Sequence, residues 1–169
     1  GMKSTIQPKV IASTGALLDP KLKKYIEDTF STMVFEVYGA TETGPIAYQL
    51  PGESKYRIMS DFLLLEFHDE NSKRVSSNQP GRMIVTKLYS GGTPIIRYNA
   101  LNDIVSPYYE SDDDKQIFAK TIQRIYGRDI IRLYRKDGKI LLGSSLTTIF
   151  SRLLYKLETS KIRELKVIQ

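Results

Sequence analysis

The stretch KVIASTGALLDPKLKKYIEDTFSTMVFEVYG, residues 9–39, decides the expected fold. Residues 9–13 and 33–37 are short runs rich in β-branched or aromatic side chains, which favour strands. A glycine-containing turn at 14–16 follows the first run, and Tyr38-Gly39 is expected to end the second. The sequence therefore predicts two strands joined by one longer segment.

That joining segment has the pattern of an amphipathic helix. Asp19 precedes Pro20, which predicts a helix start, because a carboxylate caps free amide groups and proline fits the first turn. Leu22, Ile26 and Phe30 then repeat at four-residue spacing and form one apolar face. Strand, turn, helix and strand in this order make the first unit of an α/β arrangement.

The middle of the chain has a different pattern. Residues 62–67 and 82–88 are strand-like, and a polar connection at 68–81 joins them, so they are expected to pair as an antiparallel hairpin. Residues 94–98 form a third extended piece. The expected fold class is thus mixed, α/β with an α+β character, combining a strand–helix–strand unit with antiparallel strands.

The last third contains a further hairpin signal. Residues 129–134 and 139–142 flank a turn with Asp-Gly at its tip, which is typical of a hairpin. A 3–4 spaced apolar pattern predicts a helix over 146–157, and 165–168 is expected to be a final strand. We expect the sequence to end inside a domain.

Composition narrows the possible chemistry. The chain has no cysteine and a single histidine, His68, which excludes thiolate catalysis, disulfides and cysteine-ligated metal sites. The lack of cysteine fits a reducing, cytoplasmic location, and no apolar run reaches the roughly 20 residues of a membrane span. We therefore expect a chain with no membrane partner.

The net charge of +6 is unevenly distributed. Residues 1–110 contain 12 Lys+Arg and 12 Asp+Glu, whereas residues 111–169 contain 13 and 7, so the excess lies in the last third. A basic third can bind an anionic ligand or nucleic acid, or it can be a solvated lysine-rich surface. No basic stripe interleaved with aromatic residues is present, so nucleic acid is the less favoured partner.

The densest chemical signal is VYGATETG, residues 37–44. Gly39 lets the backbone approach a ligand closely, and Thr41 can donate a hydrogen bond to a phosphate oxygen. Glu42 can hold Mg²⁺, which prefers carboxylate and phosphate oxygens, and Tyr38 offers a flat face for a base. The alternative is an ordinary polar loop.

Two later segments could extend such a site. TPIIRYNALND, residues 93–103, places Arg97 and Asp103 on a strand and the turn after it, and a carboxylate can accept two hydrogen bonds from a vicinal diol. In YGRD, residues 126–129, Arg128 could meet a phosphate or a ribose oxygen. The alternatives are an Asx-type turn and a surface arginine.

Taken in order, these motifs resemble those of the adenylate-forming enzymes. VYGATETG resembles their Tyr-Gly-x-Thr-Glu signature, and PIIRYNALND is similar to the Pro-Leu-Ile-Arg-Tyr-Arg-Thr-Gly-Asp stretch of phenylacetate–CoA ligases. STGALLDP resembles their Gly-Glu-Pro-Leu segment, and YGRD resembles the Gly-Arg-x-Asp hinge between the large and small domains. The order and spacing agree across residues 9–130.

The resemblance implies a role for each matching residue. Tyr38 would stack on adenine, and Gly15-Ala16 would line the adenine edge with backbone. Thr41 would contact the α-phosphate of ATP, and Glu42 would hold the magnesium ion. Asp103 would bind the ribose hydroxyls, so the implied ligands are ATP or AMP and Mg²⁺.

The resemblance also implies a domain division and an activity. Arg128 would assist the ribose contact, and Asp129 would be the hinge. Residues 1–127 would be the later part of the large domain and 128–169 the start of the small one. The parent enzyme would activate a small-molecule carboxylate as an acyl-adenylate and then transfer the acyl group to a thiol, most often that of coenzyme A.

Several departures from the family pattern weigh against activity of this chain alone. The family's phosphate loop would lie upstream, and Ser90-Gly91-Gly92-Thr93 is interpreted as a turn that only imitates its composition. The catalytic lysine would lie beyond the last residue, and Lys139 is interpreted as a hairpin residue. Residues 99–102 replace the usual Arg-Thr-Gly before Asp103, so the turn geometry is in question. A non-catalytic nucleotide-binding or interaction module is the alternative, and the acyl substrate and oligomeric state stay open.

Overall fold

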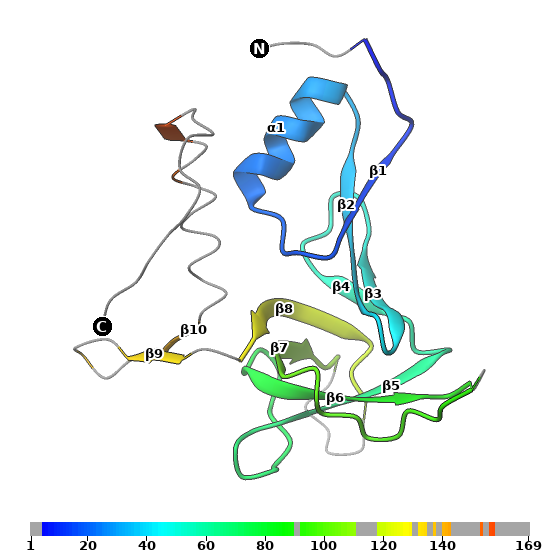
Figure 1. Cartoon of the computed structure of the whole chain (residues 1–169), viewed down its shortest axis with the longest axis vertical. Coiled ribbons are helices and arrows are strands. Elements are labelled where there is room, and N and C mark those ends of the chain that lie inside the picture. The colour runs from blue at the N-terminus through cyan, green and yellow to red at the C-terminus, as the bar shows by residue number, and fades with distance from the viewer. Residues whose placement is uncertain are drawn as a thin grey trace.

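A computed structural model describes residues 5–89, 92–110, 118–129, 132–134, 137, 140–142, 153 and 156–157. Most of its strands form one mixed sheet in the order β1-β2-β3-β4-β8-β7-β6-β5, with α1 beside the β1 end (Figure 1). The elements are β1 (Ile11–Thr14), α1 (Pro20–Phe30), β2 (Val34–Ala40), β3 (Gly44–Gln49), β4 (Tyr56–Ile58), β5 (Leu63–His68), β6 (Gly81–Lys87), β7 (Asp103–Tyr108), β8 (Thr121–Arg128), β9 (Arg132–Tyr134) and β10 (Ile140–Leu142). The mixed fold class is confirmed.

The predicted strand–helix–strand unit is present. β1 and β2 pair in parallel, with Ile11 opposite Val34, and α1 forms the crossover between them. The helix begins as expected, because a carboxylate oxygen of Asp19 accepts a hydrogen bond from the Lys21 N–H at 2.9 Å and Pro20 occupies the first turn. Local sequence signals therefore placed this unit correctly.

The predicted end of the second strand was wrong. β2 continues through Tyr38 and Gly39 and forms a hairpin with β3, a strand that the sequence analysis did not predict. A Cβ on Gly39 would lie 2.7 Å from the Gly44 carbonyl oxygen, so the glycine allows the two backbones to approach closely. The register of the pair shifts between Tyr38 and Gly39, which is typical of a β-bulge.

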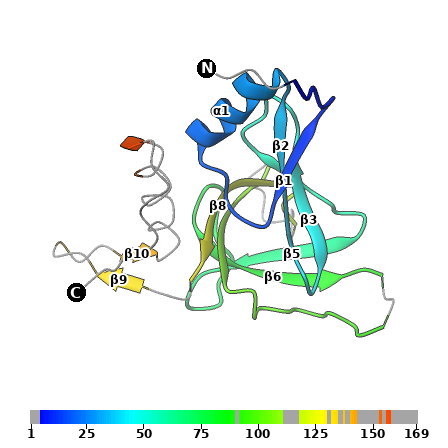
Figure 2. The ribbon, with the colours of Figure 1, turned by 45° about the horizontal axis from the view of Figure 1, so that its top comes forward.

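The antiparallel half of the sheet contains most of the core. The predicted β5–β6 hairpin is confirmed, and Leu63, Leu65 and Phe67 alternate with more exposed residues along β5. The predicted strand at 94–98 does not form: Tyr98 makes an isolated backbone bridge with Val85 of β6, and the Ile95 carbonyl accepts from the Lys87 N–H at 2.8 Å. Figure 2 shows β5 and β6 at one end of the molecule and β1 and α1 at the other.

The predicted hairpin of the last third is also present, with Ile140 of β10 opposite Tyr134 of β9. Of the expected helix over 146–157 the structure describes Leu153, Lys156 and Leu157, all helical, and the expected strand at 165–168 lies outside the described residues. Among the described residues, no helix is long and apolar enough to cross a membrane.

Candidate functional site

The carboxyl ends of β1 and β2 bring two of the predicted segments together. The two strands run in the same direction, and Thr14 of β1 lies opposite Val37 of β2. The Gly15-Ala16 turn, which follows Thr14, therefore lies beside Tyr38, which follows Val37. Gly15 has a φ of +91°, which favours glycine, and both turn residues are exposed. This edge of a parallel pair is where ligands bind in open α/β sheets.

A hydrogen bond joins the first and second predicted motifs. The Tyr38 hydroxyl on β2 donates to Oδ2 of Asp103 at the start of β7, at 2.5 Å, although 65 residues separate them. Asp103 is only 6% exposed. Burial, with the nearby Asp103 carboxylate, raises the pKa of Tyr38 well above its usual range, so the phenol stays protonated and remains a donor.

The third motif joins the same cluster. Arg128 on β8 lies opposite Asp103 in the strand register. Burial raises the pKa of Asp103 above its ordinary value of 3.8, the Tyr38 hydrogen bond and Arg128 act to lower it, and Glu42 raises it further. Tyr38, Glu42 and Arg128 therefore all act on Asp103, and the pKa values of Tyr38 and Asp103 are both shifted, as is common at functional sites.

The turn between β2 and β3 exposes two of its polar side chains and buries the third. Thr41 and Glu42 are exposed at its tip, whereas Thr43 is 2% exposed and its N–H donates to the Ala40 carbonyl at 3.3 Å. Thr41 and Glu42 are thus accessible to a ligand, while Thr43 belongs to the turn.

The structure also limits how a metal could be held. In the part of the chain that the structure describes, no group of three or more His, Cys, Asp or Glu side chains could hold a metal ion. Glu42 offers one exposed carboxylate, which fits a magnesium ion that takes its other ligands from phosphates and water. The donor set does not fit a metal held by protein ligands alone.

The unusual 99–102 turn retains a geometry that normally requires glycine. Asn102, directly before Asp103, has a φ of +54°, and asparagine is among the non-glycine residues that best tolerate this left-handed region. Its Nδ2 donates to the Ala100 carbonyl at 3.2 Å, and its own carbonyl accepts from the Asp129 N–H at 2.7 Å. The missing glycine therefore does not prevent the turn into β7.

Arg82 is a neighbour of this turn that the sequence did not predict. Its Nη1 donates to Oδ1 of Asn102 at 3.1 Å, and its Nη2 lies 3.6 Å from Oδ2 of Asp129. An arginine within a strand-like run carries no local signal of such a role. Its partners are 20 and 47 positions away, and only the folded sheet brings them together.

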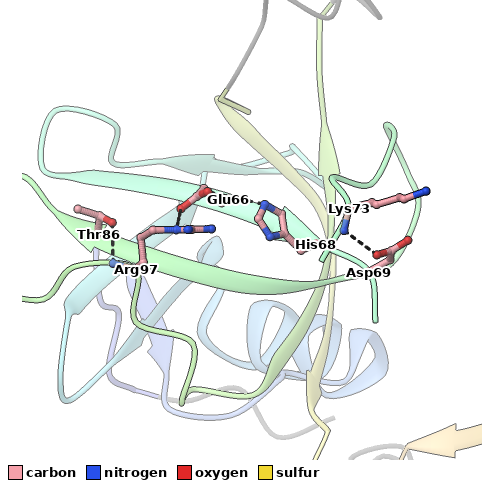
Figure 3. A network of polar contacts seen from close by, with 6 residues as sticks. All are labelled: Glu66, His68, Asp69, Lys73, Thr86 and Arg97. Carbon is pink, nitrogen blue, oxygen red and sulfur yellow. Dashed lines mark hydrogen bonds and ion pairs between the residues drawn. The ribbon is translucent and has the colours of Figure 1, made fainter. Parts of the chain in front are cut away.

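Arg97 of the second motif contacts residues of β5 and β6. Its Nε donates to Oε2 of Glu66 on β5 at 3.0 Å, and its N–H donates to Oγ1 of Thr86 at 2.9 Å (Figure 3). Nε2 of His68 lies 3.7 Å from the other oxygen of Glu66. The structure thus places Arg97 in a polar network on the β5–β6 hairpin. Of the second motif, Asp103 joins the candidate site through its hydrogen bond with Tyr38.

No protein-family model and no curated protein matches the sequence. Solved structures do match. An open conformation of 2-hydroxyisobutyryl-CoA ligase, in complex with 2-HIB-AMP and CoA, is similar with a TM-score of 0.64 at 18% identity, over 85% of this chain and 34% of that one. The anthranilate CoA ligase AuaEII, in complex with anthranoyl-AMP, is similar with a TM-score of 0.57 at 14% identity, over 82% and 28%.

A Brucella canis acyl-CoA synthetase is similar with a TM-score of 0.54 at 20% identity, over 91% of this chain and 29% of that one. At such identities the likeness shows the fold: the chain folds as part of an acyl-CoA ligase does. It spans about a third or less of the length of these ligases.

Proposed function

We propose that this chain is the adenosine-binding part of an ATP-dependent ligase that activates a carboxylate. The observation that carries the proposal is the joining of Tyr38, Asp103 and Arg128, from three separate segments, in a sheet with the fold of part of an acyl-CoA ligase. The sequence motifs that resemble adenylate-forming enzymes contain these same residues.

The adenosine half of the nucleotide would bind with its ribose at Asp103 and its adenine beside Tyr38 and the Gly15-Ala16 turn. An ionised carboxylate is a good acceptor for the vicinal hydroxyls of ribose, and Asp103 is held for this role by the Tyr38 hydroxyl and faced by Arg128. The ring of Tyr38 would stack on adenine, while the exposed backbone of Gly15-Ala16 would line its edge.

The phosphates would lie over the β2–β3 turn. Thr41 would donate to the α-phosphate, and Glu42 would hold the magnesium ion that arrives with the triphosphate and neutralises its charge. The substrate carboxylate attacks the α-phosphorus, the bond to pyrophosphate breaks, and an acyl-adenylate forms. A thiol, proposed to be that of coenzyme A, then attacks the acyl carbon and releases AMP.

The finer assignments belong to the same proposal. We assign residues 1–127 to the later part of the large domain and 128–169 to the start of the small one, with Asp129 as the hinge. The phenylacetate–CoA ligase-like subtype rests on the similarity of residues 94–103. Because no segment matches the phosphate loop or the catalytic lysine, the isolated chain should not form an adenylate.

Calorimetric titration of AMP and of magnesium–ATP tests nucleotide binding. The chain should bind both, Asp103→Ala should abolish binding, and Asp28→Ala should leave it unchanged, because Asp28 is exposed on α1. Glu42→Gln should weaken magnesium–ATP and spare AMP. A wild-type chain that binds neither ligand would contradict the proposal.

Pyrophosphate release tests the predicted inactivity. The purified chain, supplied with magnesium–ATP and a panel of aromatic, fatty and amino-acid carboxylates, should release no pyrophosphate above background. Release that depends on a carboxylate would show that the chain is active without the missing segments.

A non-catalytic nucleotide-binding module is the second candidate. It is favoured by the nearly complete burial of Asp103 beneath the Tyr38 contact, which restricts access to the carboxylate. Such a module would bind AMP and show no selective loss of magnesium–ATP when Glu42 is changed to glutamine, whereas the ligase proposal requires that loss.

A further inference from the structure

One arginine side chain spans the ends of three neighbouring strands. Arg82 belongs to β6 and lies opposite Ile104 of β7 in the strand register. Its guanidinium reaches Asn102, directly before β7, at 3.1 Å and Asp129, directly after β8, at 3.6 Å. A single planar group therefore contacts the entry to one strand and the exit from the next.

The two residues that it contacts are themselves joined. The Asp129 N–H donates to the Asn102 carbonyl at 2.7 Å, which continues the β7–β8 pairing by one step. The Asp129 side chain is only 2% exposed, whereas that of Arg82 is 39% exposed. Removing the arginine would take a cationic partner from a buried carboxylate, which is costly in a low-dielectric environment.

The contacted residues flank the pair at the centre of the candidate site. Asp103 follows Asn102 in the chain, Arg128 precedes Asp129, and Asp103 and Arg128 lie opposite each other. Asn102 also has a positive φ of +54° and depends on its surroundings to hold that conformation. The Arg82 guanidinium thus holds the outer neighbours of both members of the Asp103–Arg128 pair.

We propose that Arg82 is a positioning residue that sets the geometry of the Asp103–Arg128 pair, and through it the affinity for the adenosine part of a nucleotide. The proposal rests on the proposed function for its ligand, but the contacts that define it do not. Arginine suits the role because its fork presents several donors in a fixed plane, so one side chain can bind an amide oxygen and a carboxylate together.

Three variants separate the parts of this arrangement. Arg82→Met keeps an unbranched apolar side chain and removes the donors and the charge. Arg82→Lys keeps the charge and loses the fork. Asn102→Gly retains the left-handed turn, which glycine favours, and removes both the oxygen that Arg82 contacts and the Nδ2 that donates to the Ala100 carbonyl. Arg57→Met is the matched control, since Arg57 forms an exposed ion pair with Glu53.

Two measurements apply to each variant. Hydrogen exchange followed by NMR reports the protection of the Asp129 backbone amide, which bonds to Asn102. Calorimetry reports the affinity for AMP. Arg82→Met should lower both protection and affinity about tenfold, the scale of effect expected when binding groups are slightly misplaced. Asn102→Gly should lower both, Arg82→Lys should be intermediate, and Arg57→Met should change neither.

The outcomes distinguish the two proposals. A wild-type chain that does not bind AMP contradicts the proposed function, and protection of the Asp129 amide then decides the role of Arg82. Wild-type protection at Asp129 in Arg82→Met, or wild-type AMP affinity where the parent chain binds AMP, overturns the positioning role. If Arg82→Met does not fold, Asn102→Gly decides by the same criteria.

Discussion

The parallel β1–α1–β2 unit and the antiparallel β5–β8 strands bury their apolar side chains to very different extents. Along β5, Leu65 and Phe67 are 2% and 1% exposed. No residue of α1 is buried, and Leu22 and Tyr25 on this helix are 39% and 50% exposed. Both regions have the expected apolar periodicity, so the pattern alone does not decide how much of a face is buried.

Polar contacts connect α1 to the sheet. Nζ of Lys23 donates to Oε1 of Gln49 at 2.6 Å and lies 3.7 Å from Glu36, while a carboxylate oxygen of Glu27 accepts from the Val34 N–H at 3.0 Å. The candidate site lies where the two regions meet, since Tyr38 comes from β2 and Asp103 from β7. Because the antiparallel strands contain the more deeply buried apolar side chains, we expect substitutions in that half to affect global stability most.

The largest effect is expected from the antiparallel core. Phe67→Ala should lower the free energy of unfolding by about 3–5 kcal/mol, because it removes a buried aromatic side chain and leaves a cavity. Leu22→Ala in α1 should cost less than about 1 kcal/mol, because the leucine is already partly in water. Urea unfolding measures both. Equal losses would show that the two regions are packed alike.

A smaller loss is expected at the junction of the two regions. Gly39→Ala should cost about 1–3 kcal/mol, because its Cβ would lie 2.7 Å from the Gly44 carbonyl oxygen and 3.0 Å from Cα of Pro45, both backbone atoms. Gly52→Ala is the control. At Gly52 the φ is +80° and the space is open, so only conformational strain of about 1 kcal/mol applies. If Gly52→Ala were the more damaging, close approach of β2 and β3 would not be the reason for Gly39.

The helix cap is expected to matter less again. Asp19→Ala should destabilise the chain by about 1 kcal/mol, because the Lys21 N–H loses its acceptor. Asp28→Ala, which removes an exposed ion pair with Lys24, should cost about 0.5 kcal/mol or less. Thermal unfolding followed by circular dichroism distinguishes the two, and a larger effect for Asp28→Ala would contradict the assignment of the cap.

The smallest expected effect is a gain in stability, in contrast to the losses above, and it concerns Asp103→Asn. Because burial raises the folded-state pKa of Asp103, its contribution to stability is present below its ordinary pKa of 3.8 and is lost as pH rises through the raised value. Asp103→Asn does not titrate and should therefore gain stability relative to the wild type between pH 4 and pH 7. Urea unfolding at several pH values tests this. A stability difference that is constant with pH would show that the folded state does not raise this pKa.

The sequence by itself determined the local elements of this protein. The Asp19-Pro20 pair marked the start of α1, the alternation along residues 63–67 marked β5, and the Asp-Gly tip marked the hairpin of β9 and β10. Each of these signals acts between residues a few positions apart, where backbone geometry and the pattern of burial suffice. Sequence motifs also singled out Tyr38, Asp103 and Arg128, whose roles in binding stay predictions.

Only the tertiary structure decided how those residues meet. The strand order brings Tyr38 within hydrogen-bonding distance of Asp103 and places Arg82 across two strand ends. It also directs Arg97 to Glu66. These contacts join residues 20 to 65 positions apart, and local propensities do not encode which distant strands become neighbours in a sheet.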